Sequence, residues 1–216
     1  MAAQRFEIKY WFRREDMKIL VIGATGTIGK AVVEQLSTQH EVIRAGYKGG
    51  DVQVDLSSKA SIEELFNQVG TLDAIVSTAG AANFVSLNEA KDEDFQLALS
   101  NKLMGQVNLV RVGQEHLSDG GSITLTSGVL SRQPMPGSVT LSMVNGALES
   151  FTKAAALEVE RNIRINVVSP VFVKETMEMM GMDPASGLSA YDTAKAYVAS
   201  IEGSANGETL DVLDFV

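Results

Sequence analysis

An apolar run that leads directly into a glycine-rich turn constrains the fold of this chain more than any other feature. The run Lys18 to Ile22 precedes the turn Gly23-Ala24-Thr25-Gly26-Thr27-Ile28-Gly29, and an amphipathic stretch, Lys30 to Leu36, follows it. A strand, a tight turn and a helix in this order open a βαβ unit. The first glycine permits the turn, the second lets backbone approach a pyrophosphate, and the third packs the helix on the strand. The pattern predicts a dinucleotide site, and the alternative is a glycine-rich turn without a ligand.

Strand-like and helix-like segments alternate along the rest of the chain. We expect strands at 41–45, 52–54, 72–77, 122–126, 163–168 and 209–213, and helices at 60–68, 94–117, 142–160 and 190–201. This alternation predicts an α/β fold with a doubly wound parallel sheet, the Rossmann fold. Ligands in such sheets bind at the carboxyl ends of the strands, near the switch in strand order.

Length and composition predict one domain. The chain has 216 residues, of which 45% are hydrophobic, enough for a sizeable core. We assign residues 17–216 to the domain, with a short substrate lobe around 171–200, and expect residues 1–16 to be an extension outside the fold. The alternative for this extension is an added edge strand or docking arm, because Phe6, Ile8 and Tyr10 alternate ahead of Trp11. With no Cys and two His, no metal site is expected.

The net charge of the chain limits the classes of partner that it could bind. A formal net charge of −9 argues against nucleic acid and anionic membranes, both of which attract clustered Lys and Arg. No apolar run approaches the roughly 20 residues that cross a bilayer, and residues 1–16 lack the apolar core of a signal peptide. We therefore expect a cytoplasmic protein whose partner is a small molecule.

Several motifs resemble the short-chain dehydrogenase/reductase family over essentially all of residues 17–216. They are Asp55-Leu56, Ser77-Thr78-Ala79-Gly80, the run from Arg164 to Pro170, and Asn206-Gly207-Glu208-Thr209-Leu210. The glycine spacing, GxxGxxG, is closer to the extended and atypical branches of the family. The resemblance and the glycine turn imply these cofactor-binding residues: Gly23, Thr25, Gly26, Thr27, Ile28, Gly29, Asp55, Leu56, Ala79, Gly80, Pro170 and Val173.

The end of the second strand indicates which nicotinamide cofactor is preferred. NAD-binding folds place an acidic residue there, whereas this chain has Arg44-Ala45-Gly46-Tyr47-Lys48. Arg44 and Lys48 would neutralise a 2′-phosphate, with Tyr47 beside them and Thr25 as a hydroxyl partner. We therefore predict NADP(H). The alternative is that both cations are ordinary surface charges.

The family's catalytic motif is missing. Its typical members use a Tyr as acid and base, a Lys four residues later, an upstream Ser, and an Asn on the preceding helix. Aligned on this pattern, Leu141 takes the place of the Tyr and Asn145 that of the Lys, while Lys102 stands at the Asn. The Ser position falls on Gly128, next to Ser127.

The Asn and Lys of the family pattern have therefore exchanged places. One hypothesis is a rebuilt site, in which Lys102 binds the nicotinamide ribose or acts as an acid, Asn145 positions it, and Ser127 touches a substrate carbonyl. The alternative is that Lys102 is a solvated helix residue and that Asn101 is the family Asn displaced by one position. Tyr191 and Tyr197 are further candidates for an acid, although ordinary packing is favoured for both.

Loss of the Tyr narrows the chemistry. General acid catalysis accelerates such a reaction by about 10²–10⁴-fold. Acceptors whose reduced form can take its proton from water, such as quinones and other conjugated carbonyls, therefore lose the least rate when the Tyr is absent. Four Met between Met177 and Met182 indicate an adaptable apolar surface, either a pocket wall or lid, or plain core.

Two functions stay open: an NADPH-dependent oxidoreductase, or a non-catalytic NADP(H)-binding redox sensor or regulator. The resemblance implies a homodimer or homotetramer paired through the helices 94–117 and 142–160.

Overall fold

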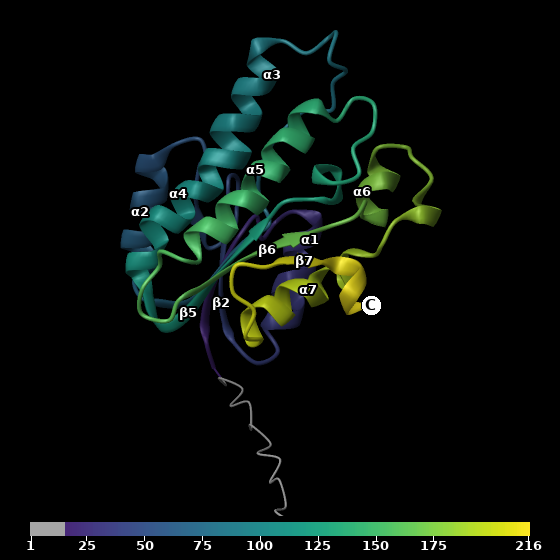
Figure 1. Cartoon of the computed structure of the whole chain (residues 1–216). Helices are drawn as coiled ribbons and strands as arrows, with labels where there is room; N and C mark the ends of the chain where they lie inside the picture. Colours follow the sequence, from purple (N-terminus) through teal and green to yellow (C-terminus); the bar gives the residue numbers. More distant parts are fainter. Residues whose placement is uncertain (1–15) are drawn as a thin grey trace, which may run out of the picture.

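One parallel sheet forms the centre of the computed structural model, which describes residues 16–216 (Figure 1). Its seven strands lie in the order β3-β2-β1-β4-β5-β6-β7, and every pairing between neighbours is parallel. The strands are β1 (Lys18–Ile22), β2 (Glu41–Gly46), β3 (Val52–Gln53), β4 (Leu72–Ser77), β5 (Leu117–Thr126), β6 (Arg164–Ser169) and β7 (Thr209–Asp211). The strand order reverses between β1 and β4, so the ligand crevice is expected at their carboxyl ends. The predictions for residues 1–15, the extension or docking arm, lie outside the described residues.

Helices cover both faces of the sheet, which confirms the doubly wound Rossmann architecture. On one face lie α2 (Lys59–Val69), α4 (Met104–Gly113) and α5 (Val139–Ala155), and on the other lie α1 (Thr27–Leu36) and α7 (Ala190–Glu202), which pack together (Figure 1). The short helices α3 (Asp92–Leu97) and α6 (Lys174–Met179) extend beyond the carboxyl ends of the strands.

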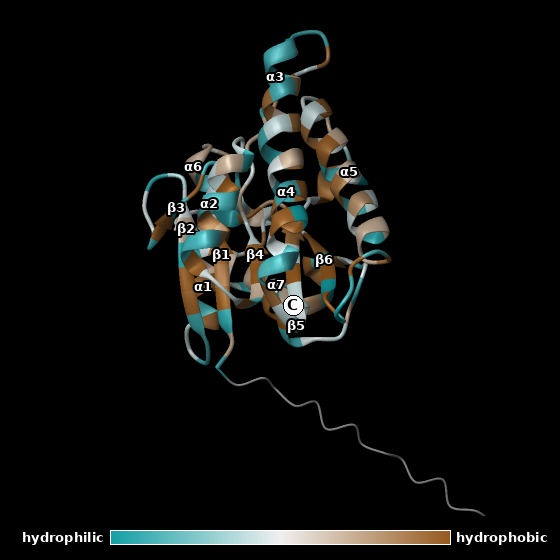
Figure 2. Ribbon diagram, turned by 90° about the vertical axis from the view of Figure 1, so that its left-hand side faces the viewer, coloured by the Kyte–Doolittle hydropathy of each residue, from teal (hydrophilic) through white to brown (hydrophobic). Residues whose placement is uncertain are grey.

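The central strands are apolar because both of their faces are covered. β1, β4 and β6 are buried over nearly their whole length, as parallel strands between two helical layers should be. Figure 2 shows these strands in the colour of hydrophobic residues, with mixed colours on the surrounding helices. Two hydrophobic clusters result: one includes Phe66 and Leu109 beneath α2 and α4, and the other includes Val32 and Ile201 beneath α1 and α7.

The prediction of a single helix at 94–117 is wrong in two respects. The chain forms α3, then a π-helical turn at Ala98–Leu103 and then α4, and Leu117 already belongs to β5. β5 starts five residues early because Leu117 pairs with Leu72, and a shift in register accommodates the intervening glycines. A Ser-Asp-Gly-Gly stretch has little strand propensity, so pairing with β4 determines its conformation. Such π-turns are frequent at functional sites, and this one contains Lys102.

Other element ends differ by a few residues from the predicted ones. The helix predicted at 142–160 begins and ends earlier, at Val139–Ala155, and the last strand ends at Asp211, where a 3₁₀ turn, Val212–Phe215, follows. Within residues 16–216, no helix combines the length and the apolar character needed to cross a membrane. The same residues contain no group of three or more His, Asp or Glu side chains arranged to hold a metal ion.

Candidate functional site

A cavity of about 540 Å³ opens where β1 to β4 end. It is lined by the last residues of β1 and β2, by the segments that follow the four strands and by one residue of the π-turn: Ile22, Gly23, Thr25, Gly26, Gly46, Tyr47, Val54, Asp55, Leu56, Ser57, Thr78, Ala79, Gly80, Ala81 and Asn101. Helix α1 begins at its edge with Gly26 as N-cap, no capping side chain and no acidic residue in its first turn. The free N–H groups and the helix dipole therefore fit a phosphate. We call this space the outer cavity.

Packing requires glycine at two of the three glycines of the turn, and the third lines the outer cavity. Gly23 has φ +85°, and a Cβ there would lie 2.7 Å from Thr78 Oγ1. Gly26 lines the outer cavity, as required of a backbone that approaches a ligand. A Cβ on Gly29 would fall 2.0 Å from the carbonyl oxygen of Gly23, so only glycine permits this contact between α1 and the turn.

The predicted cofactor residues divide into those that line a cavity and those that do not. Gly23, Thr25, Gly26, Tyr47, Asp55, Leu56, Ala79 and Gly80 line the outer cavity, and Ile28, Pro170 and Val173 line a second cavity described below. Thr27 and Gly29 lie in the first turn of α1 without lining either. Arg44 and Lys48 line neither cavity.

Arg44 is paired within the protein. Its guanidinium Nη2 lies 2.6 Å from Asp51 Oδ1, and its Nε donates to Asp51 Oδ2 at 3.1 Å. These hydrogen bonds lower the pKa of Asp51 to about 2, so the carboxylate is charged at neutral pH. Both side chains are exposed. The cation expected to neutralise a 2′-phosphate therefore already has a counter-ion.

A smaller inner cavity of about 270 Å³ adjoins the outer one, and Thr78 lines both. Its lining is mostly apolar: Ile28, Phe84, Val129, Leu130, Leu141, Pro170, Val171, Phe172 and Val173. The polar lining comes from Thr78, Lys102, Thr126, Ser127, Asn145 and Thr176, with Gly128 between them. Lys102 is the one ionisable side chain in this lining.

Lys102 extends from the π-turn into the inner cavity and is only 8% exposed. Its Nζ donates to the carbonyl of Ser127 at 3.3 Å. Burial lowers the pKa of its ammonium to about 8, because low-dielectric surroundings disfavour the charged form. Gly80 allows the close approach, since a Cβ there would lie 2.8 Å from Lys102 Cγ. The alternative in which Lys102 is a solvated helix residue is therefore wrong.

Asn101, the neighbouring residue, points to the outer cavity. Its Oδ1 accepts from the backbone N–H of Ala81 at 2.8 Å, and its Nδ2 donates to Ser57 Oγ at 2.9 Å. It therefore joins the loops after β3 and β4. Buried Gln106 holds the π-turn against β5, because its Nε2 donates to Lys102 O at 3.2 Å and to Thr126 O at 2.9 Å. The sequence gives no signal for either bridge.

Asn145 enters the inner cavity from α5 and is 2% exposed. Its Nδ2 donates weakly to the carbonyl of Gly128 at 3.5 Å, and its Oδ1 has no hydrogen-bond partner within residues 16–216. Gly128 has φ +154°, and a Cβ on it would lie 3.0 Å from Asn145 Nδ2. The position aligned with the family Ser is therefore one where the backbone and Asn145 together require glycine.

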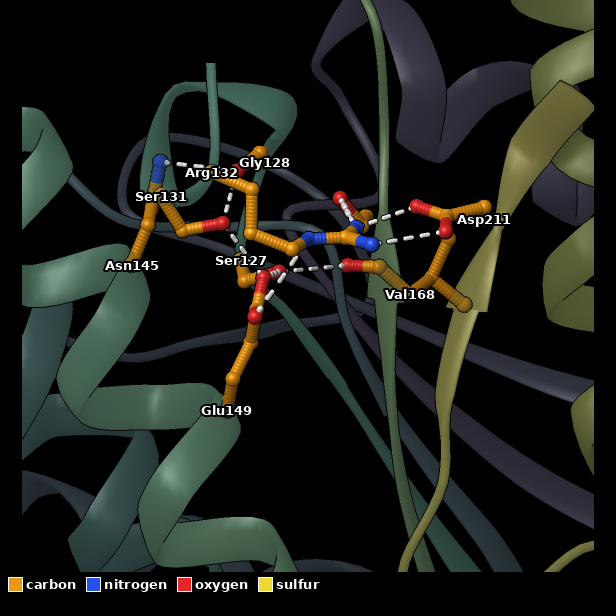
Figure 3. A network of polar contacts seen from close by, with 9 residues as sticks. Ser127, Gly128, Ser131, Arg132, Asn145, Glu149, Val168 and Asp211 are labelled. Carbon is orange, nitrogen blue, oxygen red and sulfur yellow. Dashed lines mark hydrogen bonds and ion pairs between the residues drawn. The ribbon is translucent and has the colours of Figure 1, made fainter. Parts of the chain in front are cut away.

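The hydroxyl of Ser127 is directed to a carboxylate on α5. Ser127 Oγ lies 3.1 Å from Glu149 Oε1 and 3.4 Å from the carbonyl of Val168, and Ser131 Oγ donates to the same Glu149 oxygen at 2.6 Å (Figure 3). What Ser127 offers to Lys102 is its carbonyl group. Glu149 was missed in the sequence, although it lies four residues after Asn145 and thus on the same helix face.

Arg132 continues this network across the sheet. Its Nε lies 3.6 Å from Glu149 Oε2, its Nη1 donates to Asp211 Oδ2 at 2.8 Å, and its Nη2 donates to Ser169 Oγ at 2.9 Å (Figure 3). The pKa of Asp211 is lowered, chiefly by its hydrogen bond with Arg132. The segment after β5 is thereby tied to α5, β6 and β7.

Neither candidate Tyr lines the inner cavity. Tyr197 is fully buried on the other side of β5, where its hydroxyl lies 2.7 Å from Thr126 Oγ1 and burial raises its pKa. Tyr191 is 54% exposed. Of the four Met, Met177 is buried and the others are exposed, and none lines the cavity.

The geometry agrees with comparisons to known proteins. A family model described as Enoyl-(Acyl carrier protein) reductase matches residues 6–204. An uncharacterized oxidoreductase of Methylorubrum extorquens is 31% identical over 169 residues, 74% of this chain and 66% of that one. A hydroxynaphthalene reductase of Aspergillus fumigatus is 30% identical over 169 residues, 72% of this chain and 62% of that one. The chain thus spans about two thirds or less of the length of these relatives.

Solved structures match over more of their length. The Listeria innocua protein lin1944 is 42% identical with a TM-score of 0.87, covering 91% of this chain and 99% of that one. A small-chain dehydrogenase solved in complex with NADPH is 29% identical with a TM-score of 0.80, covering 91% and 96% of the two chains. With the parallel sheet, the glycine turn and the cavity at the strand ends, these matches establish that the chain belongs to the short-chain dehydrogenase/reductase family.

Proposed function

We propose that this protein is an NADPH-dependent reductase of quinones or other conjugated carbonyls, in which the ammonium of Lys102 takes over the task of the missing Tyr. The observation that carries the proposal is the position of Lys102, which is buried in a cavity adjoining the outer one. A regulatory protein that only bound a dinucleotide would have no need of a buried amine in a second cavity.

The outer cavity fits the cofactor. The uncapped start of α1 and the backbone of Gly23 to Gly26 would hold the phosphates, and Asp55, Leu56 and Tyr47 line the same cavity. When bound, NADPH supplies the hydride. The small-chain dehydrogenase with NADPH supports this assignment by its fold and sequence. We expect a preference for NADPH over NADH because Arg44 and Lys48 would pair with the 2′-phosphate. Arg44 would give up its ion pair with Asp51 to do so.

Lys102 would act on the oxygen of the acceptor. When hydride adds to a conjugated carbonyl compound, negative charge develops on its oxygen, and a buried ammonium among apolar side chains stabilises that charge strongly. A proton then reaches the oxygen from Lys102 Nζ or from water. The carbonyl oxygen of Ser127 accepts a hydrogen bond from Nζ at 3.3 Å, and Asn145 donates to the carbonyl of the next residue, Gly128. Ser127 and Asn145 would thus position the amine.

The walls of the inner cavity favour a flat acceptor. The rings of Phe84 and Phe172 lie with centroids 6.3 Å apart and planes inclined by 26°, and both line the cavity. Flat conjugated rings pack well against aromatic faces. The relative from Aspergillus fumigatus, named as a hydroxynaphthalene reductase, supports acceptors of this kind.

Self-association through α4 and α5 is a further part of the proposal. Leu99, Met104 and Met143, from the π-turn and these two helices, are 38%, 40% and 40% exposed. Exposed apolar side chains on neighbouring helices are suited to burial against a second copy. Light scattering during gel filtration would measure the mass, and a monomer at micromolar concentration would contradict this part.

The experiment is NADPH oxidation by the purified protein against quinones, conjugated enones, aldehydes and simple ketones. We expect turnover with quinones or enones, and a loss of about 10²-fold or more in Lys102→Met. Lys153→Met, which removes an exposed Lys from α5, is the matched control and should retain wild-type rates. If no acceptor is reduced although NADPH binds, the redox-sensor alternative replaces the reductase.

A further inference from the structure

Within residues 16–216, the ammonium of Lys102 has no counter-ion. No Asp, Glu or terminal carboxylate lines the inner cavity, and within residues 16–216 no carboxylate lies within 4.0 Å of Lys102 Nζ. The carboxylate on the neighbouring helix, Glu149, is occupied by two hydroxyls and by Arg132. Lys102 donates to a single neutral acceptor, the Ser127 carbonyl, although an ammonium has three donors.

An unpaired charge in apolar surroundings is unfavourable unless a partner arrives. The side chain is 8% exposed, and the cavity around it is lined largely by Leu, Val, Ile and Phe. Low-dielectric walls raise the energy of the lone charge and at the same time strengthen its attraction to an anion. A ligand that carries its own negative charge removes the penalty and gains this attraction.

We propose that the inner cavity selects acceptors that bind as oxyanions, namely hydroxyquinones with an ionised ring hydroxyl, whose oxygen pairs with Lys102 Nζ. This inference rests on the proposed function and names the substrate class of the same site. The aromatic walls of Phe84 and Phe172 receive the ring, and Lys102 receives its charged oxygen. This selection acts in binding and is separate from proton donation by Lys102.

A substitution at Asn145 should supply the missing counter-ion of Lys102 from the protein itself. Lys102 and Asn145 donate to the carbonyls of two consecutive residues, Ser127 and Gly128. Asn145→Asp places a carboxylate of nearly the same shape in the same cavity. The variant should therefore give Lys102 an internal partner and remove the advantage of an anionic ligand.

The test compares two probes of similar shape in the protein saturated with NADP⁺, which cannot reduce them. One is 2-hydroxy-1,4-naphthoquinone, an anion at neutral pH, and the other is 2-methoxy-1,4-naphthoquinone, which is neutral. Calorimetry or fluorescence quenching gives the two dissociation constants. We expect the anion to bind roughly ten- to hundredfold more tightly, the range of a charge-assisted hydrogen bond to a buried group.

Variants assign the preference to Lys102. The ratio of the two dissociation constants should fall to within about threefold in Lys102→Met and Asn145→Asp. The preference for the anion should persist in Lys102→Arg and in the exposed control Lys153→Met. Asn145→Asp leaves Lys102 in place, so the test does not depend on tolerance of the Met variant. Equal affinities in the wild type, no binding of either probe, or a preference that survives in both Lys102→Met and Asn145→Asp would overturn the inference.

Turnover with NADPH separates this inference from the proposed function. If the anion is preferred in binding but neither quinone is reduced, the reductase proposal fails while the oxyanion site stands. If both quinones are reduced with equal kcat/KM and bind equally, the reductase stands and the oxyanion site is wrong.

Discussion

Lys102 and Asn145 contact consecutive carbonyl groups from two different helical elements. Lys102 Nζ donates to Ser127 O at 3.3 Å, and Asn145 Nδ2 donates to Gly128 O at 3.5 Å. Lys102 and Asn145, which the sequence predicts to be an exchanged Lys and Asn pair, therefore contact one short segment after β5. A cation and an amide both line the inner cavity.

Burial of Lys102 should make stability depend on pH. Its pKa of about 8 in the folded chain is below the usual 10.5, so the unfolded chain binds more protons between these values. The free energy of unfolding should therefore rise as pH increases from about 8 to 10.5, by about 3 kcal/mol in total. Below pH 8 the penalty is fully present.

Urea unfolding at pH 7.5 and 9.5 measures this effect. Relative to Lys102→Met, in which other titrations are unchanged, the wild type should gain about 2 kcal/mol between the two pH values. A constant difference between the two proteins would show that Lys102 is not buried as an amine.

Gly128→Ala should damage both stability and the site. The backbone there has φ +154°, and the new Cβ would lie 3.0 Å from Asn145 Nδ2. We expect a loss of about 1–3 kcal/mol in thermal or urea unfolding, together with lower turnover. Gly146→Ala is the control, because Gly146 is helical with no atom near its Cβ position, and it should stabilise by about 0.5–1 kcal/mol. Similar effects of both variants would contradict the argument.

Asp51→Asn should strengthen binding of NADPH. The variant removes the charge that pairs with Arg44 while leaving an oxygen for the Arg44 backbone N–H. Freed Arg44 is then available to a 2′-phosphate, so the dissociation constant of NADPH should fall several-fold while that of NADH stays unchanged. Asp92→Asn, an exposed acid in α3, controls for net charge. An equal shift for both cofactors would argue against a role of Arg44 in their discrimination.

Glu149→Gln should weaken the support beneath Lys102. Glu149 accepts from Ser127 and Ser131 and lies beside Arg132, so loss of its charge should reduce stability by about 1–2 kcal/mol. Because Ser127 holds the amine, kcat should fall while the KM for NADPH is unchanged. Exposed Glu158→Gln is the control. Unchanged kcat in Glu149→Gln would limit the network to a structural role.

The sheet and the glycine turn were predictable because their signals are local. An apolar strand, a glycine spacing and an amphipathic helix lie within about 20 residues, and Gly29 packs against Gly23 for the steric reason that its type implies. The cavity at the strand ends follows from the parallel topology alone.

Contacts between distant segments were not predictable. Three features depend on packing: the pairing of Arg44 with Asp51, the π-turn, and the early start of β5. The π-turn directs Lys102 to the inner cavity and Asn101 to the outer cavity. The family alignment found Lys102 and Asn145 by residue type, but only the fold shows that both enter one cavity.

The pH dependence of kcat/KM for quinone reduction tests the central claim about Lys102 most directly. In the wild type, kcat/KM should fall about tenfold per pH unit above a pKa near 8, where the free enzyme loses the ammonium. Lys102→Arg, which stays charged, should show no such fall up to pH 10. A wild-type profile that is flat across this range, or the same fall in Lys102→Arg, would contradict the claim that the charge of Lys102 drives the reaction.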